Sequence, residues 1–173
     1  MILNLKEFDN SQLVISAAET EDEIGTVLRM HLVVEQFLAW FIRHRISAEL
    51  APYVKEPREF GSKLSLSVAF GLPLALARVI HQINAIRNKL AHGRSALGGD
   101  QVDELARQVD KLVEIDAVFA PLARRYVELS AKRPGERMVF GAHGTRVDFL
   151  IAAMAFHGVA MKWAAVQIGG EGV

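Results

Sequence analysis

Hydrophobic side chains recur every three or four residues along most of the chain, which is the spacing typical of amphipathic helices. The first such run follows a T-E-D-E box at Thr20–Glu23 and continues to about Leu50. The box has the spacing in which a threonine and a glutamate cap the free amides at the start of a helix. Two further runs cover residues 60–70 and 73–93, and each is closed by a glycine. The first half of the chain is therefore predicted to form one long and two shorter helices.

The next part of the chain contains one more helical run and then a loop. Asp100 is placed to cap a helix that runs to about Phe119, with a resumption over residues 121–130. One proline and three glycines in residues 132–144 predict a loop, with at most a short strand around residues 138–140.

A last helix is predicted over residues 145–168, and no strand pattern of convincing length interrupts the helical runs. We therefore expect an all-α fold, an up-and-down bundle of about five to six helices that forms a single domain over residues 1–173. Residues 20–120 are expected to hold its core, residues 131–144 its loop, and the last helix is expected to pack on that core.

The composition is that of a folded domain and excludes several classes of protein. Of the 173 residues, 51% are hydrophobic and 23% are charged, which suits a chain that buries a sizeable core. Twenty basic side chains balance twenty acidic ones, which excludes a basic nucleic-acid packing protein and an acidic disordered tail. The lack of cysteine excludes disulfides, thiolate metal sites and cysteine nucleophiles. Residues 1–10 show no secretory signal, so a cytoplasmic location is expected.

One segment, residues 147–168, is apolar enough to resemble a membrane span. It nevertheless contains Asp148, His157, Lys162 and Gln167. Each charge near the centre of a bilayer costs about 2.5–3.5 kcal/mol on insertion scales. The segment is therefore interpreted as a buried core or interface helix, and no membrane partner is predicted.

One stripe of the helix predicted at residues 73–93 carries imidazoles and amides instead of the lysines and glutamates usual on a solvated face. At about 100° per residue, it aligns four side chains: His81, Asn84, Asn88 and His92. Two interpretations stay open, a contact surface or an ordinary exposed face of unusual composition. Arg87 projects at the border between this stripe and the apolar face.

The first predicted helix places His31 and Glu35 in the middle of its apolar face. That face is formed by seven hydrophobic positions: Ile24, Val27, Leu28, Val34, Leu38, Ile42 and Ile46. Buried polar groups need partners, so Arg87 is expected to pair with Glu35. The two residues either position neighbouring helices or support a site. A metal site needs a third ligand that the sequence does not supply nearby, so no metal and no cofactor is predicted.

Residues 86–93, IRNKLAHG, resemble the R-x4–6-H signature of the HEPN superfamily, the all-helical "higher eukaryote and prokaryote nucleotide-binding" domains. Two further blocks agree in order and spacing. One is an inward acidic residue in an early helix, here Glu35, and the other is an F-x-x-K-x-x-L block, here Phe60, Lys63 and Leu66. The layout is also similar to that of the mannitol operon repressor branch, and the resemblance spans residues 20–120.

In catalytic members of that superfamily, two motif helices meet across a dimer and cut RNA without a metal ion. The resemblance implies that His92 is the acid and base, that Arg87 binds phosphate or anchors the site, and that Asn88 orients them. Residues five positions apart project about 140° apart from a helix, so Arg87 and His92 do not converge within one copy. A two-fold axis presents each residue twice, so a homodimer through the stripe is expected. The candidates for binding or support are their polar neighbours: His81, Asn84, Lys89, Glu35, His31 and Lys63.

The balanced net charge is a sum of unlike segments. Residues 1–59 contain six basic and ten acidic side chains, and residues 100–173 contain nine and ten. Residues 60–99 contain no acidic side chain and five basic ones: Lys63, Arg78, Arg87, Lys89 and Arg94. An acid-free motif region suits a phosphate ligand. The alternative is that the acidic residues simply lie at helix starts.

Three functions follow as alternatives. The first is a metal-independent endoribonuclease of the toxin or RNA-processing type, with RNA as substrate and a separate antitoxin as protein partner. The second is a non-catalytic regulatory module resembling the mannitol operon repressor, which acts through protein contacts because the chain has no helix-turn-helix or zinc finger. The third is a nucleotide pocket without turnover, although neither G-x-x-x-x-G-K-[ST] nor G-x-G-x-x-G occurs.

Overall fold

The computed structural model describes residues 11–93, 96–129 and 132–169. These residues form six α-helices: α1 (Ser11–Glu19), α2 (Glu23–Arg45), α3 (Phe60–Ala69), α4 (Leu74–Ala91), α5 (Gly99–Asp110) and α6 (Thr145–Gly169). Between α5 and α6 lie two 3₁₀ turns and one two-stranded antiparallel sheet: Lys111–Glu114, Leu122–Arg124, β1 (Tyr126–Glu128) and β2 (Arg137–Val139). The predicted all-α bundle is confirmed, and β2 is the short strand expected near residues 138–140.

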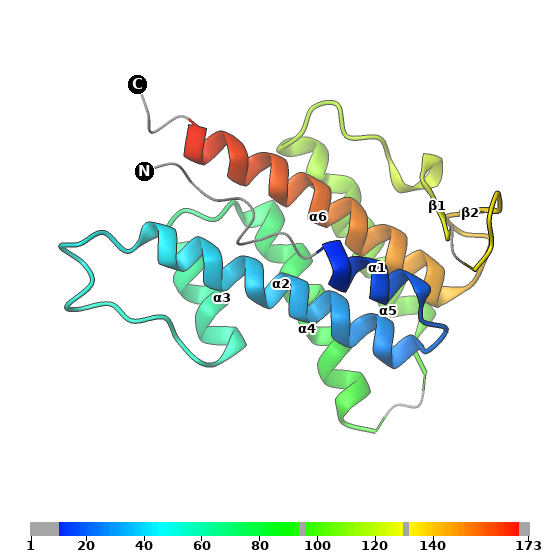
Figure 1. The fold of residues 1–173 in the computed structure, drawn as a ribbon, viewed down its shortest axis with the longest axis horizontal. Helices are drawn as coiled ribbons and strands as arrows, with labels where there is room; N and C mark the ends of the chain where they lie inside the picture. The colour runs from blue at the N-terminus through cyan, green and yellow to red at the C-terminus, as the bar shows by residue number, and fades with distance from the viewer. Residues whose placement is uncertain (1–10, 94–95, 130–131, 170–173) are drawn as a thin grey trace.

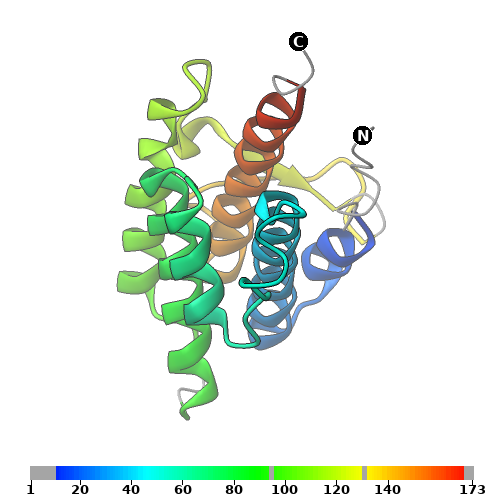
Figure 2. The ribbon, with the colours of Figure 1, turned by 90° about the vertical axis from the view of Figure 1, so that its left-hand side faces the viewer.

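The helices enclose the core in two layers. Figure 2 shows α4 and α5 in one layer and α2 and α6 in the next, with α1 on the outer side of α2. Helix α3 packs against both α2 and α4 (Figure 1). Large side chains from each layer are fully buried where the helices meet, among them Phe37 of α2, Ile83 of α4 and Phe149 of α6. Burial of each such side chain contributes about 1.5–3 kcal/mol, so packing of these faces stabilises the helices.

The capping box predicted at the start of α2 is wrong. The N-cap is Asp22, whose carboxylate accepts hydrogen bonds from two backbone N–H groups at 3.1 and 2.8 Å. The Thr20 hydroxyl accepts a hydrogen bond from the N–H of Asp22 at 3.3 Å and does not reach the first turn of α2. Glu23 instead accepts the N–H of Leu97 at 3.1 Å and the O–H of Thr145 at 3.3 Å. Its carboxylate therefore links the start of α2 to the segments that precede α5 and begin α6.

Two helices end earlier than the sequence pattern predicts. Helix α2 ends at Arg45 rather than near Leu50, after a last turn with three basic side chains. Helix α5 ends at Asp110, and the chain continues as a 3₁₀ turn. The carboxylates of Asp110 and Asp116 accept hydrogen bonds from backbone N–H groups further along the chain, which competes with helical hydrogen bonding. Residues 121–129 consequently form a turn and β1 instead of a resumed helix.

Helix α1 is not predicted by the sequence pattern, which places the first helix after Thr20. Its nine residues bury only Ala17 and Ala18, so its apolar stripe is too short to stand out. Residues 1–10 and Arg94, which contribute to the expectations of location and charge, lie outside the described residues.

Helix α6 is the segment with the composition of a membrane span. Within the described residues it is the one helix long and apolar enough to cross a bilayer, over Thr145–Gln167. In the bundle, 56% of its most apolar window is buried against the rest of the protein. Lys162 forms an ion pair with Asp116 at 2.8 Å. The structure therefore uses α6 as a core helix, as expected.

Candidate functional site

Helix α4 carries the motif residues on an element that the core holds firmly. Ile80, Ile83 and Ile86 are completely buried on one of its faces. Pro73 is its N-cap, and Gly93, with a φ of 99°, lies just beyond its end in a conformation that side chains other than glycine rarely adopt. The C-terminal turn of α4 projects from the lower edge of the bundle in Figure 1. Polar side chains on its other faces are thus presented from a rigid support.

A polar cluster joins α2 to α4 and consists of His31, Asn84, Arg87 and Asn88. His31 Nε2 lies 3.0 Å from Asn84 Oδ1. Because an amide oxygen only accepts hydrogen bonds, Nε2 carries the proton. One face of this imidazole stacks on the ring of Phe60 of α3, with 4.5 Å between the ring centroids. The fold therefore brings together two predicted residues from different helices and adds an aromatic contact that the spacing alone does not predict.

Burial holds His31 in its neutral form. Burial lowers the pKa of the His31 imidazole below the ordinary value of 6.5, and the positive charge of Arg87 acts in the same direction. The hydrogen bond to Asn84 and the negative charge of Glu35 oppose this effect and do not overcome it. His31 is only 6% exposed. A neutral imidazole at this position keeps the cluster from carrying two adjacent positive charges.

We expect the protein to lose stability on acidification, and His31 is one of two histidines, with His157, whose pKa is lowered by burial. Its pKa is lower in the folded than in the unfolded state, so the unfolded state binds more protons as the pH falls through about 6.5. The free energy of unfolding therefore decreases over that window. His31→Gln should show a smaller fall in melting temperature between pH 7.5 and pH 5.5, whereas exposed His143→Gln should match the unmodified protein. Equal slopes for all three proteins would contradict this assignment.

Arg87 belongs to the polar cluster. Its Nη1 donates a hydrogen bond to Asn88 Oδ1 at 3.0 Å. Its Nε–H is buried and has no acceptor among the residues that the structure describes. A buried donor without a partner costs about 1–3 kcal/mol. Arg87 is therefore a half-buried cation with one buried N–H that has no acceptor within the described residues.

The predicted pair of Glu35 and Arg87 is wrong, because α3 supplies the partner of Glu35. Lys63 Nζ lies 2.8 Å from Glu35 Oε1 and 3.7 Å from Glu56 Oε1. Arg43 extends the network to Glu56 at 3.1 Å. Lys63 is a buried residue, and its ammonium group lies between these two carboxylates. The network fastens α3 to α2 and leaves Arg87 to the polar cluster.

Replacing Lys63 by methionine should destabilise the fold by about 1–3 kcal/mol. A broken, fully buried pair costs about 3–5 kcal/mol, and the 29% exposure of the Glu35 side chain reduces this penalty. Arg43→Met serves as the matched control, because its side chain is 55% exposed and its pair contributes little. Urea unfolding of both variants measures the difference. Equal losses would show that Lys63 does not hold this network together.

The stripe on α4 does not form one uniform surface. Asn84 and Asn88 are half-buried and make hydrogen bonds inside the chain. Three predicted site residues on α4 and at its end are exposed: the binding candidates His81 and Lys89, and the catalytic candidate His92. His92 is the C-cap, and its backbone N–H bonds to the Asn88 carbonyl at 3.0 Å. Arg87 thus lies beside Asn88, half-buried, whereas the His92 side chain is exposed at the projecting helix end.

The N-terminal half of α2 exposes an apolar stripe, although its hydrophobic spacing predicts that part of this stripe is buried. Ile24, Leu28 and Leu32 follow one another at intervals of four residues and are 39%, 45% and 42% exposed. Ile24 and Leu28 were predicted to be buried, and this prediction is wrong. Helix α3 covers the same face only further along, where Lys63 reaches Glu35. One feature of the sequence indicates this exposure. Apolar residues occur on more sides of α2 than the neighbouring helices can cover.

Within the described residues, no group of three or more histidine, aspartate or glutamate side chains is arranged to hold a metal ion. His31 and Glu35, considered above as a ligand pair, bind Asn84 and Lys63 instead. Comparison with protein-family models, curated proteins and solved structures finds no match to this chain.

Proposed function

We propose that the protein is a HEPN-like RNA-binding protein and a metal-independent endoribonuclease whose site forms at a homodimer interface. The observation that carries this proposal is the position of Arg87. Its guanidinium is held by Asn88, and its buried Nε–H lacks an acceptor within the described residues. A phosphate oxygen is a strong acceptor for a guanidinium group, and it reaches this Nε–H once the half-buried side chain turns outward. His92 is exposed five residues further on, at the end of the same motif.

The proposed reaction needs only a proton-transfer group and a fixed cation. The 2′-hydroxyl of a ribose attacks the adjacent phosphorus as its proton is removed, and the bond to the 5′-oxygen breaks as that oxygen gains a proton. The products are a 2′,3′-cyclic phosphate and a 5′-hydroxyl. His92 transfers the protons, and Arg87 stabilises the charge on the phosphorane. Asn88 orients Arg87 through the hydrogen bond at 3.0 Å.

Two copies are needed because Arg87 and His92 lie about 140° apart around one helix. The exposed stripe of Ile24, Leu28 and Leu32 on α2 supplies an apolar surface for the second copy. The hydrogen bond between His31 and Asn84 places this half of α2 beside the C-terminal half of α4. An isologous contact through these two helices would place each His92 near the partner copy.

Leu28→Glu should weaken the dimer by at least about tenfold. Burial of one leucine contributes about 1.5–3 kcal/mol, and about 1.4 kcal/mol is a factor of ten in affinity. Val118→Glu is the control, because Val118 is 81% exposed and lies outside the stripe. Sedimentation equilibrium gives both dissociation constants. A monomeric unmodified protein, or a Leu28→Glu dimer of unchanged affinity, would contradict the proposed interface.

The proposed activity is tested by incubating the purified protein with RNA in EDTA. Cleavage that persists without divalent metal and leaves 2′,3′-cyclic phosphate ends is the expected result. Cleavage abolished by EDTA, or products with 3′-hydroxyl ends, would contradict the proposal.

The exposed stripe on α2 also favours a second candidate, a regulatory module resembling the mannitol operon repressor. Ile24, Leu28 and Leu32 would then contact a different protein. In that case the protein forms a stable complex that Leu28→Glu disrupts, and it cleaves no RNA. The half-buried Arg87 has no role in this alternative, so we favour the ribonuclease.

A further inference from the structure

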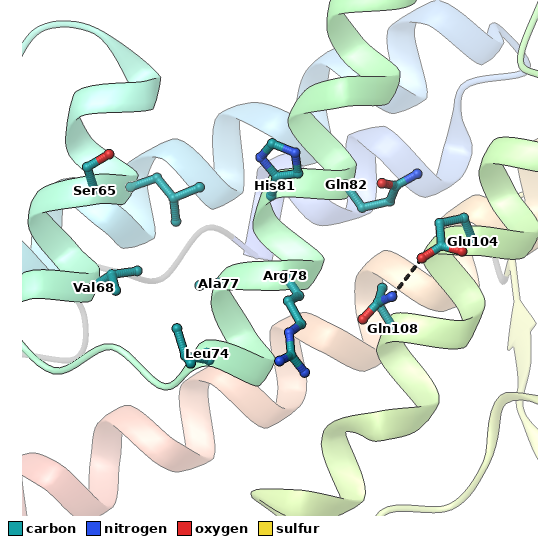
Figure 3. Close-up of a pocket in the computed structure, with 10 residues that line it drawn as sticks. Ser65, Val68, Leu74, Ala77, Arg78, His81, Gln82, Glu104 and Gln108 are labelled. Atoms are coloured by element: carbon teal, nitrogen blue, oxygen red, sulfur yellow. Dashed lines mark hydrogen bonds between the residues drawn. The ribbon is translucent and has the colours of Figure 1, made fainter.

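A groove crosses α4 away from the polar cluster, and the proposed function does not use it. It has a volume of about 570 Å³, which lies in the range of pockets that hold small ligands. Figure 3 shows residues of α3 on one side, residues of α5 on the other, and α4 between them. Ten residues line it: Leu64, Ser65, Val68, Leu74, Ala77, Arg78, His81, Gln82, Glu104 and Gln108. We refer to it as the α4 groove.

One side of the α4 groove is apolar. Leu64 and Val68 project from α3, and Leu74 and Ala77 continue this surface on α4. Leu74 is 61% exposed, although it begins a helix whose other leucines are buried. An exposed leucine beside further apolar side chains favours contact with an apolar group, and the face of a nucleobase is one such group.

The charges of the α4 groove favour an anion. Arg78 and His81 are exposed and have no hydrogen bond or ion pair with the residues that the structure describes. The one acidic residue in the lining, Glu104, is already engaged. Its Oε2 accepts two hydrogen bonds from Arg107 at 3.0 and 2.6 Å, and its Oε1 accepts one from Gln108 at 2.6 Å. The free positive charge of Arg78 is therefore not balanced locally.

Gln108 leaves an acceptor unused beneath the α4 groove. Its Nε2 donates to Glu104, which fixes the orientation of the amide. Its Oε1 is buried and has no donor within the described part of the chain. If the Gln108 side chain turns toward the groove that it lines, a ligand with an N–H group would remove the cost of this unpaired acceptor. Every nucleobase carries such a donor on its hydrogen-bonding edge.

We infer that the α4 groove is a nucleoside subsite that binds single-stranded RNA away from the site of cleavage. The base contacts Leu74 and Val68, and Arg78 and His81 bind the adjoining phosphate. A duplex does not fit, because its base faces are stacked and unavailable to an apolar wall. His81 lies about 16 Å from His92 along α4, at 1.5 Å per residue, so one extended strand follows the helix from the groove to the motif. This inference rests on the proposed function and names a second RNA contact for it.

The test is fluorescence anisotropy with a labelled 12-nucleotide RNA that carries 2′-O-methyl groups, which block cleavage. Arg78→Gln should weaken binding about three- to tenfold and reduce the slope of log affinity against log salt by about 0.7, the value for one phosphate contact on a single strand. Leu74→Ser should weaken binding by a similar factor and leave the salt slope unchanged. Arg124→Gln, an exposed arginine outside the groove, is the matched control.

The outcomes separate this inference from the proposed function. If Arg78→Gln binds as Arg124→Gln does while cleavage depends on His92, the α4 groove is not an RNA subsite and the proposed activity stands. If duplex RNA of the same sequence binds as tightly as the single strand, the subsite is overturned as well. If the unmodified protein neither binds nor cleaves RNA, both proposals are wrong.

Discussion

Replacing His92 by alanine should lower the rate of RNA cleavage by about 10²–10⁴-fold, the range that a positioned acid or base contributes. The position of the His92 side chain explains this expectation. His92 ends α4 at its projecting tip, where its imidazole is exposed and reachable by a phosphodiester. It forms the C-cap only through its backbone N–H, so the alanine variant retains that hydrogen bond. The change should therefore affect the reaction and not the fold, as measured by cleavage rate and melting temperature together.

His143→Ala is the control for this experiment. His143 is also exposed, but it lies in the loop before α6 and outside the motif helix. It should retain full activity. A His92→Ala protein that cuts RNA at the unmodified rate would remove His92 from the reaction and with it the assignment to this mechanism.

The sequence predicted the helices that bury a continuous apolar face. For α4, apolar residues at positions such as Ile80, Ile83 and Ile86 indicated both the element and its buried side, and all three are fully buried. The same pattern does not define α1, whose burial is limited to two alanines. It also extends α5 too far, because the carboxylates of Asp110 and Asp116 bind backbone N–H groups that helical periodicity does not take into account.

The sequence identified polar residues on the helix faces but not the partners that they contact in the structure. His31 of α2 lies 3.0 Å from Asn84 of α4, whereas Glu35 and Lys63 pair with each other between α2 and α3. The partner of Glu35 was wrong because helical spacing places two side chains inward without specifying which neighbouring helix reaches them. Lys63 of α3 reaches Glu35 at 2.8 Å, whereas Arg87 bonds to its neighbour Asn88. Pairing between helices depends on their packing, which one sequence does not contain.

The wrong prediction of burial for the exposed stripe on α2 also arises because one sequence does not show how the helices pack. Periodicity assigned Ile24 and Leu28 to the core because it identifies an apolar face and not the length over which a neighbour covers it. Helix α3 covers the part of that face near Glu35 and leaves the N-terminal part open. This uncovered length is the main structural reason to expect a second copy.

The central claim is that one active site combines Arg87 of one copy with His92 of the other. Arg87→Gln and His92→Ala proteins should each be inactive, and each should remain folded by melting temperature. When they are mixed in equal amounts and allowed to exchange subunits, about half of the dimers contain one copy of each, and one of the two sites in such a dimer is intact. Cleavage should then return to about a quarter of the unmodified rate. A mixture that stays inactive although mixed dimers are shown to form would contradict the shared site.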